Sequence, residues 1–327
     1  KEGIESNLIP CAGQVDPTVI ASIQRLVAQT GADVVHAHGY KADVYAYFAL
    51  RGTATPLVST CHNWLKDGPL VSFYGMVDRF TLRSYAGVIA VSDEVKAKLL
   101  KAGVRAKRIH LIRNGIDMRP FADAKPSLRI DGESITVVGW IGRLSNEKGA
   151  DIFLRAAVSV LTECPNTRFV VVGDGPDLAM LNALIDDLNI RKSVSLIGRR
   201  EDMPAVYASL DVMVSSSRQE GLPMAILEGM ASGLPLVATA VGDVPTVVRD
   251  GRTGILVPSE NVGALAAAIV ELLRDASLRM RLGSTARSLI AEEFSAERMA
   301  MNYLRVYEDA LAPGKTSSWS AFRSATI

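Results

Sequence analysis

Two glutamates interrupt the otherwise mostly apolar run RQEGLPMAILEGMASG. Glu220 lies in a turn after the strand-like segment that ends in SSS, and Glu228 lies inside a helix that we expect to begin near Pro223. A carboxylate held against an apolar helix needs hydrogen-bond donors, and sugar or ribose hydroxyls are suitable ones. The alternative is that each glutamate pairs with a nearby arginine, such as Arg218 or Arg199.

Two cations follow a buried strand in VVGWIGRLSNEKG. The strand ends at Gly142, and Arg143 and Lys148 come in the turn that leads into a helix expected to start near Asn146 or Glu147. A helix N-terminus beside two cations is the outline of a diphosphate site. The alternative is that Lys148 is solvated and Arg143 pairs with Glu147.

Three histidines lie at predicted strand ends, His36 and His38 in VVHAHGY and His62 in STCHNW. Ligand sites of parallel sheets lie at that edge, so His38 and His62 are candidate site residues. A hydrogen-bonded histidine that shapes a loop is the other interpretation. No carboxylate has metal-ligand spacing to them, so we predict no bound metal.

Two further strand ends carry glycines. VVVGDGP has G-x-G but lacks the third glycine and the later acidic residue of a dinucleotide fingerprint, so we expect a tight turn there. In SLIGRR the backbone at Gly198 and the side chain of Arg199 could face a nucleotide base.

The elements that must position these residues follow a βαβ pattern. In the first half, helical stretches separate the strand-like segments DVVHAH, PLVSTCH, GVIAVS and IHLIRNG. In the second half the strand-like segments are ITVVGWIG, TRFVVVGDG, SVSLIGR, DVMVSSS, PLVATA and GILVP. Continuous apolar strands are typical of a parallel sheet covered by helices on both faces. We therefore predict two doubly wound α/β domains with a cleft between them.

The pattern also predicts the domain limits. We expect a first domain over residues 1–120, a linker over 117–133 and a second domain over 134–294. A C-terminal helix over 295–312 is expected to return to the first domain, and 313–327 to form a loose tail.

The composition excludes several classes of protein. The 327 residues are 48% hydrophobic and 22% charged, which is typical of a globular protein, and the net charge of +1 argues against nucleic acid as a partner. The three cysteines, Cys11, Cys61 and Cys164, form no C-x-x-C pair, which fits a reducing cytosol. The sequence has no membrane-spanning stretch and no signal-peptide pattern, so we expect a cytoplasmic protein.

A basic stretch precedes the expected linker, with Asp117 as the only acid in it. Its cations are Lys96, Lys98, Lys101, Arg105, Lys107, Arg108, Arg113 and Arg119. One interpretation is a solvated helix face and loop. The other is a patch that rests on anionic lipid at the inner membrane face.

These segments together resemble one known family. IGRLSNEKG, GDGP and EGLPMAILEGMASGLPLVAT, followed by GDVPTVVRDGRTGILVP, are similar to the C-terminal domain of the family 4 retaining glycosyltransferases, or glycosyl transferases group 1. The likeness spans about residues 134–260 and continues weakly through DVVHAHG, STCHN, IAVSDEVK and LIRNGID. It implies the GT-B fold, with two Rossmann-like domains that face each other across a cleft.

The resemblance also implies a chemistry. It implies metal-independent transfer of a sugar from a UDP- or GDP-linked donor to a glycan or lipid-linked acceptor, with retention of configuration. Expected settings are bacterial cell-surface polysaccharide or glycolipid synthesis. A nucleotide-sugar epimerase and a non-catalytic partner subunit remain alternatives. A glycan phosphorylase would need a lysine for pyridoxal phosphate and a much longer chain.

Individual residues take roles by their match to the family motifs. Glu220 and Glu228 match its E-x7-E motif, which implies that Glu228 holds the ribose hydroxyls and that Glu220 contacts the donor sugar. Arg143 and Lys148 would bind the diphosphate, and His62 matches a histidine near the anomeric centre. The implied donor site comprises Gly142, Arg143, Lys148, Gly198, Arg199, Glu220, Gly221, Leu222, Pro223, Met224 and Glu228.

The beginning of the chain departs from the family pattern. The sequence starts at Lys1, and the family's first strand and glycine-rich loop have no counterpart before the first helix. We therefore expect an incomplete first domain with an exposed sheet edge.

Overall fold

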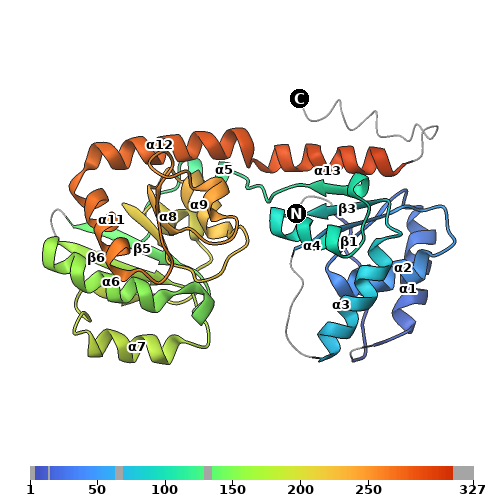
Figure 1. Cartoon of the computed structure of the whole chain (residues 1–327), viewed down its shortest axis with the longest axis horizontal. Coiled ribbons are helices and arrows are strands. Elements are labelled where there is room, and N and C mark those ends of the chain that lie inside the picture. Colours follow the sequence, from blue (N-terminus) through green and yellow to red (C-terminus); the bar gives the residue numbers. More distant parts are fainter. Residues whose placement is uncertain (1–3, 14, 63–68, 129–134, 312–327) are drawn as a thin grey trace. The chain divides into compact units, whose positions relative to one another are not determined.

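The computed structural model describes residues 4–13, 15–62, 69–128 and 135–311. It divides the chain into two compact units, one formed by Lys1–Arg113 with Ala300–Ile327 and the other by Asn114–Met299. Figure 1 shows the elements of both units, which are described separately below. The tail expected at 313–327 lies outside the described residues.

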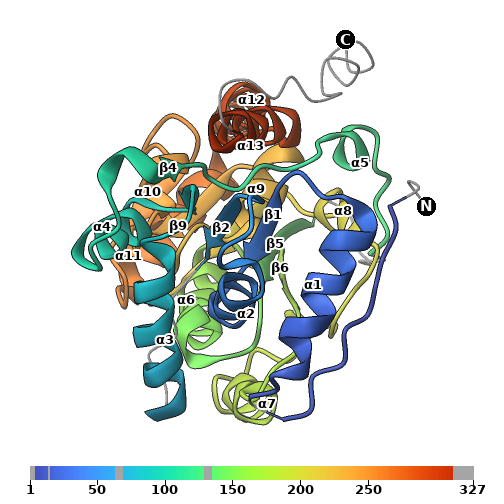
Figure 2. The same ribbon diagram turned by 90° about the vertical axis from the view of Figure 1, so that its right-hand side faces the viewer.

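The first unit contains a four-stranded parallel sheet in the order β1-β2-β3-β4. The strands are β1 (Val35–His38), β2 (Leu57–Cys61), β3 (Gly87–Ala90) and β4 (Ile109–Leu111). The helices are α1 (Thr18–Thr30), α2 (Tyr40–Leu50), α3 (Pro69–Leu82), α4 (Asp93–Lys101) and the 3-10 turn η1 (Ala106–Arg108). α1 packs beside α2, and α2 beside α3 (Figure 2).

Alternating residues of the first sheet serve its two faces. On one face, Tyr85 is fully buried and its hydroxyl donates to the carbonyl of Asp43 in α2 at 2.6 Å. On the other face, helix α13 (Ala296–Ala310) contacts the strands through Tyr303 and Tyr307, whose hydroxyls bond to Thr60 and His36. Gly87 of β3 makes room for it, because a Cβ there would come within 2.8 Å of Val306 Cγ1. The part of α13 from Ala300 onward belongs to this unit.

The second unit contains a six-stranded parallel sheet in the order β10-β9-β8-β5-β6-β7. The strands are β5 (Thr136–Ile141), β6 (Thr167–Val172), β7 (Val194–Leu196), β8 (Val212–Ser215), β9 (Leu236–Thr239) and β10 (Ile255–Val257). The longer helices are α6 (Ala150–Glu163), α7 (Leu178–Asp187), α9 (Met224–Ala231), α11 (Val262–Arg274) and α12 (Ala276–Glu293). Shorter elements are α5 (Arg119–Ala122), η2 (Asn146–Lys148), α8 (Met203–Tyr207) and α10 (Val244–Val247).

Each face of the second sheet has its own apolar core. Val138 and Trp140 of β5 join a cluster with α6, α7 and α11. Val137, which precedes Val138 in the sequence, joins a second cluster with α8, α9 and α12. Burying a large apolar side chain contributes about 1.5–3 kcal/mol, so two such cores hold the sheet and its edge loops firmly. The predicted doubly wound parallel α/β architecture is confirmed.

The segment expected to be a linker packs on the second unit. Ile116 pairs with Ser295, and Phe121 lies against Tyr207 with ring centroids 5.9 Å apart. The amide of Ser127 donates to the carbonyl of Ala205. The units therefore divide after Arg113 and not within 117–133, of which 129–133 lie outside the described residues.

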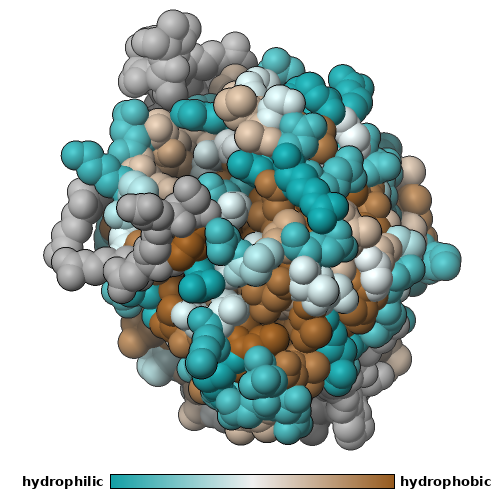
Figure 3. Space-filling view, turned by 90° about the vertical axis from the view of Figure 1, so that its left-hand side faces the viewer, coloured by the Kyte–Doolittle hydropathy of each residue, from teal (hydrophilic) through white to brown (hydrophobic). Residues whose placement is uncertain are grey.

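The surface carries apolar groups among polar ones. Figure 3 shows hydrophobic side chains scattered between hydrophilic ones on one face of the second unit. Within the described residues, every helix is too short or too polar to cross a bilayer.

Candidate functional site

The predicted cations and Glu220 come from two loops at one edge of the second sheet, and Glu228 lies in α9, which follows the second loop. β5 and β8 are parallel neighbours, with Trp140 beside Val214, so the loops that follow them start side by side. In the strand order, β6 follows on the far side of β5, whereas β9 follows in the opposite direction, on the far side of β8. Open parallel sheets bind ligands at such a reversal of strand order, beyond the carboxyl ends of the strands.

Lys148 and Glu220 form an ion pair between these two loops. Lys148 Nζ lies 2.6 Å from Glu220 Oε1, and the side chains are 26% and 7% exposed. Ser217 Oγ donates to the same carboxylate oxygen at 2.8 Å. Glu220 thus pairs with Lys148 and not with Arg218 or Arg199, the partners that the sequence had left open.

The turn that carries Lys148 differs from the predicted helix start. Asn146–Lys148 forms a 3-10 turn, and α6 begins only at Ala150. Gly149 separates them with a φ of +66°, and a Cβ there would lie 2.1 Å from the carbonyl oxygen of Ser216. The close approach of the two loops therefore sets where the helix starts.

Arg143 is an exposed cation beside this pair. Its guanidinium makes no hydrogen bond or salt bridge to any residue that the structure describes. Glu147, its suggested partner, accepts instead from Ser145 Oγ at 2.6 Å. The pKa of Glu147 is lowered first by that hydrogen bond and then by the charges of Arg143 and Lys148. Gly142 precedes Arg143. A Cβ atom at position 173 would lie only 1.8 Å from the carbonyl oxygen of Gly142, so Gly173 approaches this turn closely.

Glu228 is held by a tyrosine of α8. Its Oε2 accepts a hydrogen bond from the hydroxyl of Tyr207 at 2.8 Å. Tyr207 is fully buried, and burial together with the charge of Glu228 raises the pKa of its hydroxyl. Sequence reasoning missed Tyr207, because a tyrosine on a separate short helix carries no local signal for a partner 21 residues away.

The turn from Gly221 to Met224 connects the two glutamates. Pro223 caps α9 in an extended conformation, and Met224 is 40% exposed. The carbonyl of Gly221 accepts from the amide of Asp243 at 3.2 Å. Gly242 closes over the turn with a φ of +53°, and a Cβ there would lie 1.8 Å from the carbonyl oxygen of Glu220. The GDVP segment, noted only as a motif, thus supports the glutamate turn.

Gly198 and Arg199 lie at the end of β7. The carbonyl of Gly198 accepts from the amide of Gly173 at 2.9 Å, and its own φ is +70°. Arg199 is exposed, whereas its neighbour Arg200 pairs with Asp202 at 2.7 Å. Among the described residues, no hydrogen bond or salt bridge joins Gly198 or Arg199 to the Lys148 and Glu220 pair.

The first unit gathers its three strand-end histidines into one stack. His38 Nδ1 lies 3.2 Å from His62 Nε2, and the His36 and His38 ring centroids are 4.4 Å apart. His36 also bonds to the hydroxyls of Thr60 at 2.8 Å and Tyr307 at 2.6 Å. Tyr307 comes from α13 and was not predicted.

Desolvation favours the neutral form of these imidazoles. It lowers the pKa of His36 to about 4, with help from the nearby His38 and His62. It likewise lowers the pKa of His38 and of His62. In the described part of the chain, no group of three or more histidine, cysteine, aspartate or glutamate side chains could hold a metal ion.

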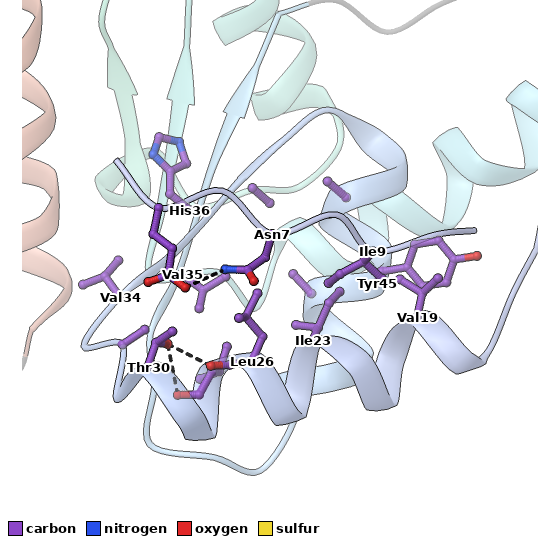
Figure 4. A pocket seen from close by; sticks show the side chains of 16 residues that line it. Asn7, Ile9, Val19, Ile23, Leu26, Thr30, Val34, Val35, His36 and Tyr45 are labelled. Atoms are coloured by element: carbon purple, nitrogen blue, oxygen red, sulfur yellow. Dashed lines mark hydrogen bonds between the residues drawn. The ribbon is translucent and has the colours of Figure 1, made fainter. Parts of the chain in front are cut away.

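An apolar cavity of about 600 Å³ in the first unit is lined by residues of α1, β1 and α2. Figure 4 shows its lining, with Leu26 and Ile23 of α1 opposite Val35 of β1. The ring of His36 points away from Leu26 in this view, toward the partners described above. The cavity includes none of the predicted donor-site residues.

Comparison with known proteins identifies the family. The description "Glycosyltransferase Family 4" matches residues 3–119, and "Glycosyl transferases group 1" matches residues 135–275. An alpha-D-kanosaminyltransferase from Streptomyces kanamyceticus is 30% identical over 315 residues, which cover 89% of this chain and 81% of that protein. N-acetyl-alpha-D-glucosaminyl L-malate synthase from Bacillus anthracis is 26% identical over 312 residues, which cover 92% and 81%.

A solved structure shares the fold. HepE from Anabaena, crystallised in complex with UDP, superimposes with a TM-score of 0.77 at 24% identity and covers 88% of this chain and 81% of its own. The two parallel sheets with helices on both faces are those of the GT-B fold. The chain therefore belongs to glycosyltransferase family 4 and is an enzyme that transfers a sugar to an acceptor.

Proposed function

We propose that the loops after β5 and β8 bind a UDP-sugar, and that the enzyme transfers this sugar with retention of configuration to a glycan or lipid-linked acceptor. The observation that carries the proposal is the Lys148 and Glu220 pair, with the exposed Arg143 beside it at the same sheet edge. HepE, which shares the fold, was crystallised with UDP, and this supports uracil as the donor base.

The two cations suit the diphosphate of the donor. Arg143 offers a planar fork with five N-H donors, and Lys148 a compact ammonium. When the bond between the sugar and the diphosphate breaks, negative charge develops on the leaving oxygen, and fixed cations stabilise it there. We assign this role to Arg143 and Lys148.

The two glutamates suit hydroxyl groups at different ends of the donor. Tyr207 engages Oε2 of Glu228, and we assign Oε1 to the ribose hydroxyls. Glu220 lies at the end of the turn nearest Lys148, so we assign it to the donor sugar. Their different partners argue against a general acid and base pair.

The acceptor hydroxyl must transfer its proton to another group during the reaction. In the proposed reaction the acceptor oxygen bonds to the anomeric carbon on the face from which the diphosphate departs, and its proton passes to the departing phosphate oxygen. We assign His62 to the donor sugar by its match to the family's histidine, and partial desolvation, which lowers its pKa, favours the neutral imidazole there. This assignment adds no charge that would compete with the oxocarbenium-like sugar.

A panel of UDP- and GDP-linked sugars tests the proposal. We expect release of UDP from one donor in the presence of an acceptor, and a product whose anomeric coupling in proton NMR matches that of the donor. An epimerase would convert the donor without an acceptor, and an inert partner subunit would release nothing. An inverted anomeric centre would contradict retention.

The basic stretch supports a smaller membrane contact than its sequence suggested. Lys98 pairs with Glu94, Arg113 with Asp93 and Arg119 with Asp117, so these acids neutralise three of the eight cations. Arg119 also belongs to the second unit. The exposed side chains of α4 and of the residues after it include Leu100, Lys101, Arg105 and Lys107, together with Asp93 and Glu94 at the start of α4.

We propose that the side chains of Leu100, Lys101, Arg105 and Lys107 rest on anionic lipid at the cytoplasmic face of a membrane, where each cation would contribute about 1 kcal/mol. Sedimentation with vesicles of phosphatidylcholine, with and without phosphatidylserine, measures this. The double variant Lys101→Glu with Lys107→Glu should lose the phosphatidylserine-dependent binding. Lys192→Glu, a variant of the second unit, should keep it. Equal sedimentation of all three proteins would contradict the membrane role.

A further inference from the structure

Arg218 lies in the loop after β8 and contacts the loop after β5, and the mechanism above gives it no role. Its Nη1 and Nη2 donate to Oδ1 and Oδ2 of Asp151, both at 2.8 Å. Nη1 also donates to the carbonyl of Asn146 at 2.7 Å, and Nε donates to Glu260. The side chain is only 20% exposed, so nearly all of its donors face protein groups.

The backbone around Arg218 contacts the same turn. The amides of Arg218 and Gln219 both donate to the carbonyl of Glu147, at 2.8 and 3.2 Å. Ser216 Oγ donates to the carbonyl of Gly149 at 2.7 Å. The loop after β8 therefore holds the residues on both sides of Lys148, while Lys148 itself points to Glu220.

The two carboxylates around Arg218 come from two other segments of the second unit. Glu260 has a φ of +62°, a conformation that non-glycine residues keep only where surrounding contacts maintain it. Asp151 opens α6 in its first turn, and its hydrogen bond to Arg218 lowers its pKa. The planar guanidinium thus joins the start of α6, the Lys148 turn and the segment before α11 at one point.

We propose that Arg218 is a positioning residue, which holds the Asn146–Lys148 turn against the loop after β8 and so places Lys148 Nζ for the diphosphate of the donor. The inference rests on the proposed function of Lys148, but the contacts that carry it are separate from the donor contacts. A lysine cannot replace the fork, because its single ammonium cannot reach Asp151, Asn146 and Glu260 in one plane.

The first test compares UDP with UMP, which lacks the β-phosphate. We expect Arg218→Met to weaken UDP binding in isothermal titration calorimetry by about tenfold or more, the scale of one charge-assisted hydrogen bond, while UMP binding changes little. Arg218→Lys should give a smaller loss. Arg191→Met is the matched control, because Arg191 makes the same two-pronged pair with Asp186, at 2.8 Å for both bonds, and should leave both affinities unchanged.

The second test asks whether Arg218 acts through Lys148. If it does, Arg218→Met should cost nothing further for UDP in a Lys148→Ala background. Losses that add in the double variant, or equal losses for UDP and UMP, would overturn the proposal.

The third test needs no nucleotide and separates the clamp from the donor site. The Nζ resonance of Lys148 in 15N-labelled protein should shift in Arg218→Met and in Asp151→Asn, but not in Arg191→Met. An unchanged Lys148 resonance in folded Arg218→Met protein would overturn the proposal. A shifted resonance, together with wild-type protein that binds UDP and UMP equally, would support the clamp and refute the diphosphate role of Lys148.

Discussion

Lys148 Nζ and Glu220 Oε1 lie 2.6 Å apart, and each group comes from a loop at the end of a different strand. The carboxylate is nearly buried, whereas the ammonium is partly open to solvent. A donor diphosphate that approaches Lys148 must share it with Glu220. The pair therefore keeps the lysine in place before the donor arrives.

Lys148→Ala should affect stability as well as turnover. It leaves Glu220 with Ser217 as its remaining partner, and an unpaired buried charge of this kind costs about 1–3 kcal/mol of unfolding free energy. Adding Glu220→Gln removes the charge, so the double variant should regain most of that stability without regaining activity. Urea denaturation and UDP release measure the two effects. Recovery of activity in the double variant would contradict the role of Lys148.

Glu228→Gln should weaken nucleotide binding only when the ribose hydroxyls are present. We expect a loss of roughly tenfold for UDP, because a hydrogen bond from a hydroxyl to a charged acceptor is worth about 1.5–3 kcal/mol. For 2′,3′-dideoxy-UDP the variant and the wild type should bind alike. Calorimetry with both ligands decides this, and the same loss for both would place Glu228 away from the ribose.

Tyr207→Phe should show how much the second partner of Glu228 contributes. The hydroxyl is fully buried, so its removal should cost about 1 kcal/mol of stability. Because Glu228 then loses its anchor, UDP binding should also weaken several-fold. Thermal denaturation measures the change in stability, and calorimetry measures the change in UDP affinity. Unchanged UDP affinity would mean that Tyr207 contributes only to the core and not to nucleotide binding.

Gly242→Ala should destabilise the glutamate turn. A methyl group there would collide with the carbonyl of Glu220, and the positive φ adds strain. We expect a loss above about 2 kcal/mol, against about 1 kcal/mol for Gly251→Ala. Gly251 is the control because its φ is also positive, at +66°, but a Cβ there meets no atom within 4 Å. Equal losses of stability in the two variants would mean that the positive φ alone, and not the collision with Glu220, causes the destabilisation.

Acid should destabilise the first unit through His36. Its pKa is lowered to about 4, so between about pH 6.5 and 4 the unfolded chain binds a proton that the folded protein does not. The stabilising contribution of the neutral imidazole is therefore present above pH 6.5 and lost as the pH falls toward 4. After solvent screening it amounts to about 1–2 kcal/mol.

His36→Gln should remove that part of the pH dependence. Asp43 acts in the opposite direction, because burial and the charge of Asp78 raise its pKa to about 8 and its contribution is lost as the pH rises from 3.8 toward 8. The difference in urea stability between wild type and variant at pH 7 and pH 5 isolates His36. A difference that does not change with pH would contradict the buried neutral imidazole.

The sheets were predictable because their signal is local. Runs such as TRFVVV and DVMVS are apolar on both faces, which a strand needs when helices cover both sides. The spacing of Glu220 and Glu228 and the cations after β5 were also readable, since strand ends of a parallel sheet meet at one edge.

The partners of these residues were not predictable, because they depend on contacts between distant segments. No local pattern shows that Lys148 meets Glu220, 72 positions away, or that Arg218 meets Asp151, 67 positions away. The helix expected at Asn146 failed for the same reason, because Ser216 approaches Gly149 and shifts the helix start to Ala150. Lys98 and Arg113 looked unpaired in the sequence because their partners, Glu94 and Asp93, precede the basic stretch.

Release of UDP from its cognate sugar donor, compared between wild type and the double variant Lys148→Ala with Glu220→Gln, tests the central claim most directly. The variant should fold like the wild type, because it leaves no unpaired buried charge. We predict that the wild type releases UDP in an acceptor-dependent manner and that the folded variant releases it at least about a hundredfold more slowly, the scale of removing one transition-state contact. A folded variant with wild-type release would contradict the donor site described here.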